Sequence, residues 1–179
     1  MIQRIQSLLL LLAACAIMTL FVFPIAKYQG QTSVGTTVSA ELKLIPESNP
    51  QMLDQITSGG DVVVDQASFI KVWPLTVLAV VVGLIALVSI FLYRNRMLQM
   101  RLVAVGFLLN VVYVFLVFFW AVDKFDTVIR ALPEFVQSDL AMTYSLGTWT
   151  PIVSVVLLFF AQRAIKSDEA KVRAADRLR

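Results

Sequence analysis

A short basic turn between two long uncharged apolar runs constrains the fold of this chain more than any other feature. The runs cover residues 73–92 and 102–122. Each is about 20 residues long, the length that an α-helix needs to cross the roughly 30 Å core of a bilayer. The turn, Tyr93–Arg101, holds three arginines and no acid. Because short loops rich in Lys and Arg stay in the cytoplasm, the sequence predicts a helical hairpin that enters and leaves a membrane from that side.

Composition and two further apolar runs extend this prediction to the whole chain. Hydrophobic residues make up 59% of the sequence and the mean hydropathy is +0.81, values typical of a membrane protein. We therefore expect one membrane domain over residues 1–179, an all-α four-transmembrane-helix bundle. Leu12–Cys15 resembles a lipoprotein cleavage box, but the apolar run continues well beyond it, so we expect a retained span. The predicted spans are residues 7–26, 73–92, 102–122 and 146–162.

The segments outside the spans have their own patterns. In the first outer loop, residues 27–72, apolar and polar residues alternate over 33–45, and 61–72 is rich in valine. Period two is typical of strands, so we expect a small extracytoplasmic β-hairpin or sheet in this loop. In the second outer loop, residues 123–145, apolar residues follow helical spacing and predict an amphipathic helix that Pro133 interrupts. The charged tail, residues 163–179, lacks Pro and Gly and is expected to continue the fourth helix.

The distribution of charges and indole rings gives the orientation. Ten of the fifteen basic residues fall at the amino terminus, in the basic turn or in the tail. The three tryptophans, Trp73, Trp120 and Trp149, fall at the opposite ends of the spans, where amphipathic rings prefer the membrane interface. Both termini are therefore expected in the cytoplasm.

The chain lacks the residues that most catalytic or metal sites need. It has no histidine, and its one cysteine, Cys15, lies in an apolar run. A Ser-His pair and a cysteine-based zinc site are thus excluded, and no Gly-rich phosphate loop is present. No span carries Asp, Glu, Lys, Arg or His in its apolar core, which argues against an ion-driven pump. We expect no enzymatic activity, no cofactor and no metal. The basic residues lie at helix ends rather than on one face, which argues against nucleic-acid binding.

Two polar residues lie near the middle of the third span. Asn110 and Tyr113 form a possible intramembrane polar contact. A lone Asn in a span usually hydrogen-bonds a neighbouring helix, and less often marks a substrate path. Both interpretations remain open at this point. In the second span, Ala79 and Gly83 form a small-x-x-x-small pair that favours close helix packing.

Three stretches resemble an uncharacterised family of small inner-membrane proteins from Bacteroidota, catalogued as domain of unknown function 4293. They are the amino-terminal Met1–Ser7, the turn Tyr93–Leu102, and the tail segments Arg163–Lys166 and Ala174–Arg179. The resemblance implies four spans in the inner membrane of a Gram-negative bacterium. It implies no activity and no catalytic residues.

The function that the sequence favours is binding or stabilising a partner without catalysis. The basic turn and the charged tail offer a cytoplasmic docking surface, on which we expect the acids of the tail to lie near the arginines of the turn. The alternative is a solvated tail that only sets the topology. Exposed pairs of this kind contribute about 0–1 kcal/mol each and would orient the tail rather than hold the fold. Its partners would be the lipid bilayer and another membrane protein or a second copy of the chain. A small transporter or lipid-handling protein is the alternative. The predicted docking residues are Arg94, Arg96, Arg101, Asp168, Glu169, Arg173 and Asp176.

Overall fold

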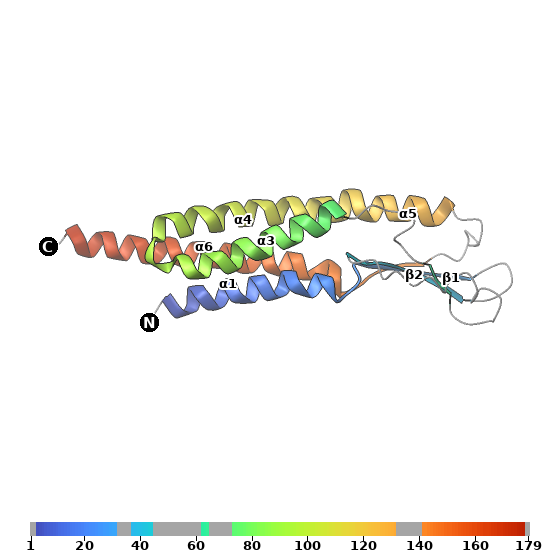
Figure 1. Ribbon diagram of the computed structural model, residues 1–179, viewed down its shortest axis with the longest axis horizontal. Coiled ribbons are helices and arrows are strands. Elements are labelled where there is room, and N and C mark those ends of the chain that lie inside the picture. The colour runs from blue at the N-terminus through green and yellow to red at the C-terminus, as the bar shows by residue number, and fades with distance from the viewer. Residues whose placement is uncertain (1–2, 32–36, 45–61, 65–72, 132–140, 178–179) are drawn as a thin grey trace. The chain divides into compact units, whose positions relative to one another are not determined.

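The computed structural model describes residues 3–31, 37–44, 62–64, 73–131 and 141–177, and it is mostly helical with one small sheet (Figure 1). Among the described residues, three helical segments are long and apolar enough to cross a membrane, namely Trp73–Phe91, Arg96–Thr127 and Leu146–Val172, and Ile5–Phe21 is a shorter apolar helix. In chain order the elements are α1 (Gln3–Met18), a 3-10 turn (Thr19–Phe21), β1 (Ala26–Gln31), β2 (Thr37–Leu42), β3 (Val62–Val64), α3 (Trp73–Phe91), a 3-10 turn (Leu92–Arg94), α4 (Arg96–Leu116), a π-helical turn (Val117–Ala121), α5 (Val122–Ala131), β4 (Ala141–Tyr144) and α6 (Leu146–Arg177).

The chain divides into two compact units, which we describe separately. The helical unit comprises Met1–Thr19, Val77–Val114 and Thr150–Arg179. The sheet unit comprises Leu20–Thr76 and Phe115–Trp149.

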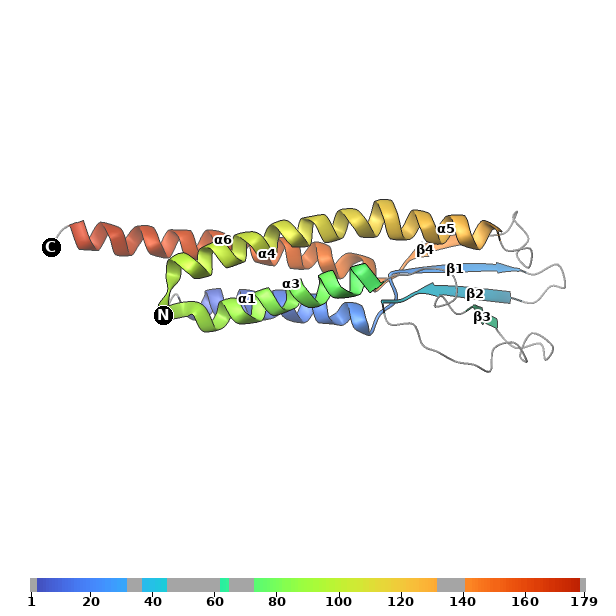
Figure 2. The same cartoon turned by 45° about the horizontal axis from the view of Figure 1, so that its top comes forward.

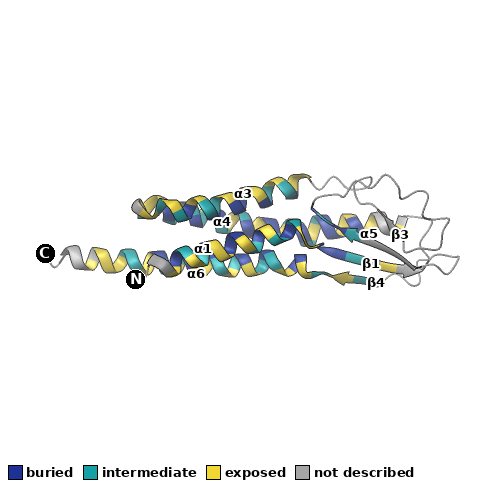
Figure 3. Cartoon of the chain, turned by 60° about the horizontal axis from the view of Figure 1, so that its bottom comes forward, coloured by how far each residue is buried: buried dark blue, intermediate teal, exposed yellow. Residues whose placement is uncertain are grey.

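In the helical unit, buried positions recur along each helix at alternating intervals of three and four residues. This spacing keeps one narrow stripe of each helix facing its neighbours, as in coiled-coil packing. Figure 3 shows the resulting alternation of buried and exposed positions along α1, α3, α4 and α6. All four helices contribute to one hydrophobic core cluster. The stripes consist of Gln6, Leu10, Ala13 and Ile17 on α1; Ala79, Val82, Ala86 and Ser89 on α3; Gln99, Val103, Gly106, Asn110 and Tyr113 on α4; and Pro151, Ser154, Leu158, Ala161 and Ile165 on α6.

Small residues in these stripes bring the helices close together. Ala79 and Gly83, the predicted small-residue pair, are both buried, and a Cβ atom added at Gly83 would lie 2.7 Å from Met18 Cε on α1. A Cβ atom added at Gly106 on α4 would lie 2.8 Å from Ile85 Cγ2 on α3. Without a hydrophobic driving force between helices in lipid, such close van der Waals packing is what favours helix association.

In the part of the sheet unit that the structure describes, four strands lie in the order β3-β2-β1-β4 (Figure 2). The strands β1 and β2 form an antiparallel hairpin in which Ala26 pairs with Leu42, and β4 adds antiparallel to the other edge of β1. The short β3 pairs with β2 in parallel. At the root of the hairpin the side chains of Ile25, Leu42 and Leu44 are almost completely buried. The sheet is therefore anchored at the end where its strands leave the apolar segments.

Several predicted boundaries differ from the observed ones. The first helix ends at Phe21 rather than continuing to residue 26, because Pro24 restricts the residue before it and Ile25 donates its N–H to Leu42 O at 2.7 Å. The expected small sheet within residues 27–72 is confirmed, but its strands do not pair as a simple hairpin of 33–45 with 61–72. The segment 33–45 supplies β2, whose antiparallel partner is β1, and the described part of 61–72 is β3, which pairs with β2 in parallel.

The second polar segment contains one expected element and one unexpected element. The amphipathic helix is α5, on which Phe125 is buried. The strand β4 follows it, where no strand was predicted. The expected interruption at Pro133 lies outside the described residues. The charged tail continues the helix of the fourth apolar run, and α6 extends without a break to Arg177.

An ion-paired carboxylate on the hairpin makes the stability of the sheet unit depend on pH. Glu41 lies opposite Lys27 in the β1–β2 register, with Lys27 Nζ 2.6 Å and Lys43 Nζ 3.4 Å from its carboxylate oxygens. Burial alone would raise the pKa of Glu41, but the hydrogen bond and charge of Lys27, helped by Lys43, outweigh burial and lower the pKa from 4.5. A lowered pKa in the folded state stabilises the fold above pH 4.5, and this contribution is lost as the pH falls through the folded-state pKa.

We therefore expect the sheet unit to lose stability on acidification below pH 4.5, by no more than about 1 kcal/mol because the pair is partly solvated. Thermal unfolding in detergent at pH 7 and at pH 3 measures the loss. In Glu41→Gln the difference between the two conditions should shrink, and an unchanged difference would contradict the assignment.

Candidate functional site

The candidate site lies at one end of the helical unit, where the α3–α4 turn, the start of α1 and the charged half of α6 come together (Figure 1). We call this the basic end. Asn95 forms the turn: its N–H donates to Leu92 O at 3.0 Å, and its side-chain Oδ1 accepts a hydrogen bond from Leu98 N at 3.4 Å. Asn is a favoured residue before the first turn of a helix because its side chain satisfies a free N–H there. The turn thus fixes where α4 begins.

Two buried glutamines tie the helices together in pairs at the basic end. On α4, Gln99 is 3% exposed, and its Nε2 donates to Ser89 O of α3 at 3.0 Å. On α1, Gln6 is 6% exposed, and its Nε2 donates to Ala164 O of α6 at 3.3 Å and to the Asp168 carboxylate. A buried amide that is hydrogen-bonded in this way resists separation of the helices, since breaking the bond leaves a polar group unpaired.

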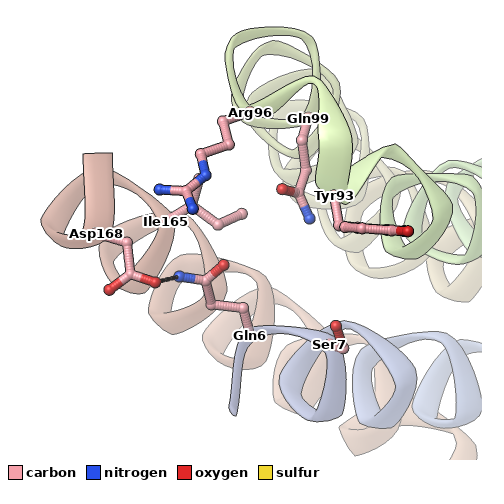
Figure 4. Close-up of a pocket in the computed structure, with 7 residues that line it drawn as sticks. All are labelled: Gln6, Ser7, Tyr93, Arg96, Gln99, Ile165 and Asp168. Atoms are coloured by element: carbon pink, nitrogen blue, oxygen red, sulfur yellow. Dashed lines mark hydrogen bonds between the residues drawn. The ribbon is translucent and has the colours of Figure 1, made fainter. Parts of the chain in front are cut away.

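A small pocket lies between these two pairs of helices (Figure 4). The space open to water centres is about 10 Å³, which is close to what one water molecule needs and too small for an organic ligand. Figure 4 shows the Arg96 side chain reaching across the pocket toward Asp168. The pocket is lined by Gln6, Ser7, Tyr93, Arg96, Gln99, Ile165 and Asp168.

The structure brings together some of the predicted docking residues. Arg96 and Asp168 line the same pocket, but the described part of the chain forms no ion pair between them, and the Asp168 carboxylate is bound by Gln6. Glu169 lines a separate groove between α4 and α6. Arg101 is exposed. The side chains of Arg94, Arg173 and Asp176 lie outside the described residues.

The polar pair Asn110 and Tyr113 lies far along α4 from the basic end, and both side chains are 0% exposed. A hydrogen bond from Asn110 to a neighbouring helix, one of the two interpretations above, is not formed among the described residues. The Asn110 Nδ2 and Oδ1 atoms and the Tyr113 hydroxyl have no hydrogen-bond partner among the described residues. A polar contact between α6 and α1 is made elsewhere, by Ser154 Oγ donating to Ala13 O at 3.2 Å.

The described residues also contain no group of three or more His, Cys, Asp or Glu side chains that could hold a metal ion. Asp126 accepts hydrogen bonds from Arg130 Nε at 2.9 and 3.0 Å. The described residues of the basic end therefore bring hydrogen-bonding and charged side chains together.

The comparison with known proteins agrees with the resemblance seen at the two ends and the central turn. A family model described as a domain of unknown function (DUF4293) matches residues 2–178. No curated protein matches the chain. Because the match covers nearly the full length, the chain belongs to the DUF4293 family.

Proposed function

We propose that this chain is a four-span protein of the bacterial inner membrane, with both termini in the cytoplasm, which binds or stabilises a protein partner without catalysis. Three helices already have the length and hydropathy of membrane spans. With its terminal 3-10 turn, α1 adds a rod of about 30 Å at 1.5 and 2.0 Å per residue, close to the thickness of a bilayer core. Packing of all four helices around one core cluster supports a single four-helix bundle in the membrane.

The observation that carries the proposed partner binding is the free length of α6. Within the helical unit, α6 extends beyond the ends of α1, α3 and α4 (Figures 1 and 2). Its described side chains there are mostly exposed, including Lys171 and Val172. The base of this helix is held by Gln6 at Asp168. A charged helix held rigidly at its base and open along its length can present one fixed surface to a partner.

Transport is less well supported. A transport path would bring Asn110 and Tyr113 into contact with solvent or solute, whereas both side chains are fully buried. A catalytic role would need a nucleophile next to a base, and the sequence has no histidine to serve as that base.

The proposed orientation predicts the behaviour of reporter fusions. We expect green fluorescent protein fused after Arg179 to fluoresce, and alkaline phosphatase at the same position to be inactive, because the phosphatase folds only in the periplasm. Phosphatase fused after a truncation at Asp61 should be active. High phosphatase activity from the Arg179 fusion would overturn the orientation.

If the partner docks on the tail, neutralising the acids of the tail should lower the amount of partner that co-purifies. The variant Asp168→Asn/Glu169→Gln/Asp176→Asn keeps the size of each side chain and leaves an acceptor for Gln6. We expect its co-purifying partner, quantified by mass spectrometry after extraction in mild detergent, to fall about tenfold or more, since losing a buried or bidentate charge contact costs more than 1.4 kcal/mol.

The matched control for this experiment is Asp123→Asn/Asp126→Asn on α5, which should keep the partner at the wild-type ratio. Both variants must elute as single species with wild-type helicity. Wild-type recovery of the partner by the tail variant would contradict docking through these residues.

A further inference from the structure

A second hollow at the basic end lies between α4 and α6. It is an open groove of about 290 Å³ lined by Met100, Lys166, Glu169 and Ala170. It shares no lining residue with the small pocket around Arg96 and Asp168. Its lining combines an apolar side chain from α4 with a cation, a carboxylate and an alanine from α6, and it is large enough for the polar part of a lipid.

The face of α6 that lines this groove carries a further cation and an aromatic residue along the helix. Phe159, Arg163, Lys166 and Ala170 follow one another at intervals of four, three and four residues, so they share one face of the helix. Arg163 and Lys166 are exposed, and Phe159 is 49% exposed. One face of α6 therefore presents an aromatic surface followed by two cations.

The aromatic part of this face is shared with α4. The rings of Phe107 and Phe159 have centroids 6.3 Å apart and are tilted by 46°. Phe107 lies two helical turns along α4 from Met100, which lines the groove. Between α4 and α6 there is thus a continuous surface that is apolar at Phe107 and Phe159 and basic at Arg163 and Lys166.

We propose that this groove is a binding site for an anionic phospholipid. The phosphate and its glycerol backbone occupy the groove beside Lys166 and Arg163, and one acyl chain lies along Phe107 and Phe159. Charge complementarity favours an anionic head group, since each Lys or Arg near the membrane surface adds to the attraction for acidic lipids. Glu169 at the groove repels the phosphate, so removing its charge should strengthen binding, whereas removing the cations should weaken it. The proposal rests on the membrane placement of α4 and α6 proposed above.

The test is native mass spectrometry of the full chain, delipidated in detergent and titrated with phosphatidylglycerol or phosphatidylcholine of the same acyl composition. We expect wild-type protein to bind phosphatidylglycerol about tenfold more tightly than phosphatidylcholine. Arg163→Gln/Lys166→Gln should lose about that factor for phosphatidylglycerol and leave phosphatidylcholine binding unchanged. Glu169→Gln should bind phosphatidylglycerol more tightly than wild type.

Two further variants separate the head-group site from general charge and from acyl contact. Lys171→Gln, an exposed cation of the same helix outside the groove, should bind both lipids as wild type does. Phe159→Ala should weaken the binding of both lipids by a similar factor, because it removes acyl contact without changing charge.

Three results would overturn the proposal: unchanged phosphatidylglycerol binding in Arg163→Gln/Lys166→Gln, an equal loss in Lys171→Gln, or full competition by millimolar glycerol 3-phosphate, which would indicate a soluble-anion site. Failure of the proposed membrane placement is a separate result, since the protein would then remain in the soluble fraction before any lipid is added.

Discussion

Adding a single methyl group at Gly147 is expected to destabilise the sheet unit by about 1–3 kcal/mol, the usual cost of overpacking a close contact. A Cβ atom at this position would lie 2.5 Å from Pro24 O, 2.8 Å from Phe23 O and 2.9 Å from Pro24 C. All three are backbone atoms, which cannot turn aside as a side chain can. The Gly147 N–H also donates to Pro24 O at 3.1 Å, so relief of the clash would break that hydrogen bond.

Hydrogen bonds on either side of Gly147 connect the start of α6 to the segment before β1, so a displacement at Gly147 affects both. Ser145 N–H donates to Ile25 O at 3.0 Å, and the Thr148 hydroxyl donates to the same oxygen. These bonds join the start of α6 to the segment between the first helix and β1. A displacement at Gly147 → Ala would therefore loosen the pairing of β4 with β1.

Hydrogen exchange of the β1 and β4 amides and thermal unfolding in detergent both measure this effect. The matched control is Gly83→Ala, where the closest atom to the new Cβ is Met18 Cε, the end of a flexible side chain. Its small steric cost is opposed by the better helix propensity of Ala, about 1 kcal/mol in a helix interior. We expect Gly83→Ala to unfold close to wild type or above it. A Gly147→Ala variant that unfolded at the wild-type temperature would contradict the close backbone contact.

The helices follow from local sequence, while the sheet does not. Long uncharged runs predict helices wherever they occur, and α3 and α6 begin at Trp73 and Leu146, where their predicted spans began. The helix α4 begins at Arg96, before the predicted start at residue 102, because Asn95 caps the helix ahead of the apolar run. By contrast, β1 (Ala26–Gln31) has no alternation strong enough to mark a strand, and it pairs with β4, which is more than 100 residues away in sequence. Pairing of this kind depends on where the helices deliver the chain, and no local window contains that information.

The candidate site was predicted in part, for a similar reason. Charge alone indicated that Arg96 and Asp168 would meet at one end of the helical unit, and they line one pocket. It did not indicate that Gln6 would take the hydrogen bond to Asp168, or that Gln99 would bind α3 at Ser89 O. A usable signal was present, since Gln6 and Gln99 lie in register with the buried stripes of α1 and α4. Polar residues at such positions are buried, and they must find partners when the helices pack.

Replacing Asn110 by leucine is expected to raise the stability of the helical unit by about 1–3 kcal/mol, and replacing Tyr113 by phenylalanine to raise it by a smaller amount. Both Asn110 amide atoms and the Tyr113 hydroxyl are buried without a hydrogen-bond partner among the described residues. An unpaired buried polar group costs about 1–3 kcal/mol, and an apolar side chain of similar size removes that cost. Thermal unfolding in detergent, with helicity as the readout, measures the change.

The control for this prediction is Asn95, a second asparagine whose side chain does form a hydrogen bond. Asn95 Oδ1 accepts a hydrogen bond from Leu98 N at the start of α4, so Asn95→Leu removes a helix cap and should cost about 1 kcal/mol. Replacing Asn by Leu is thus expected to raise the free energy of unfolding at Asn110 and to lower it at Asn95. If Asn110→Leu were instead destabilising by about 0.6–2 kcal/mol, the size of an interhelical hydrogen bond in a membrane, the amide would have a partner in the folded protein. The polar pair would then be part of the packing of α4, and its burial would no longer count against a polar path through the bundle.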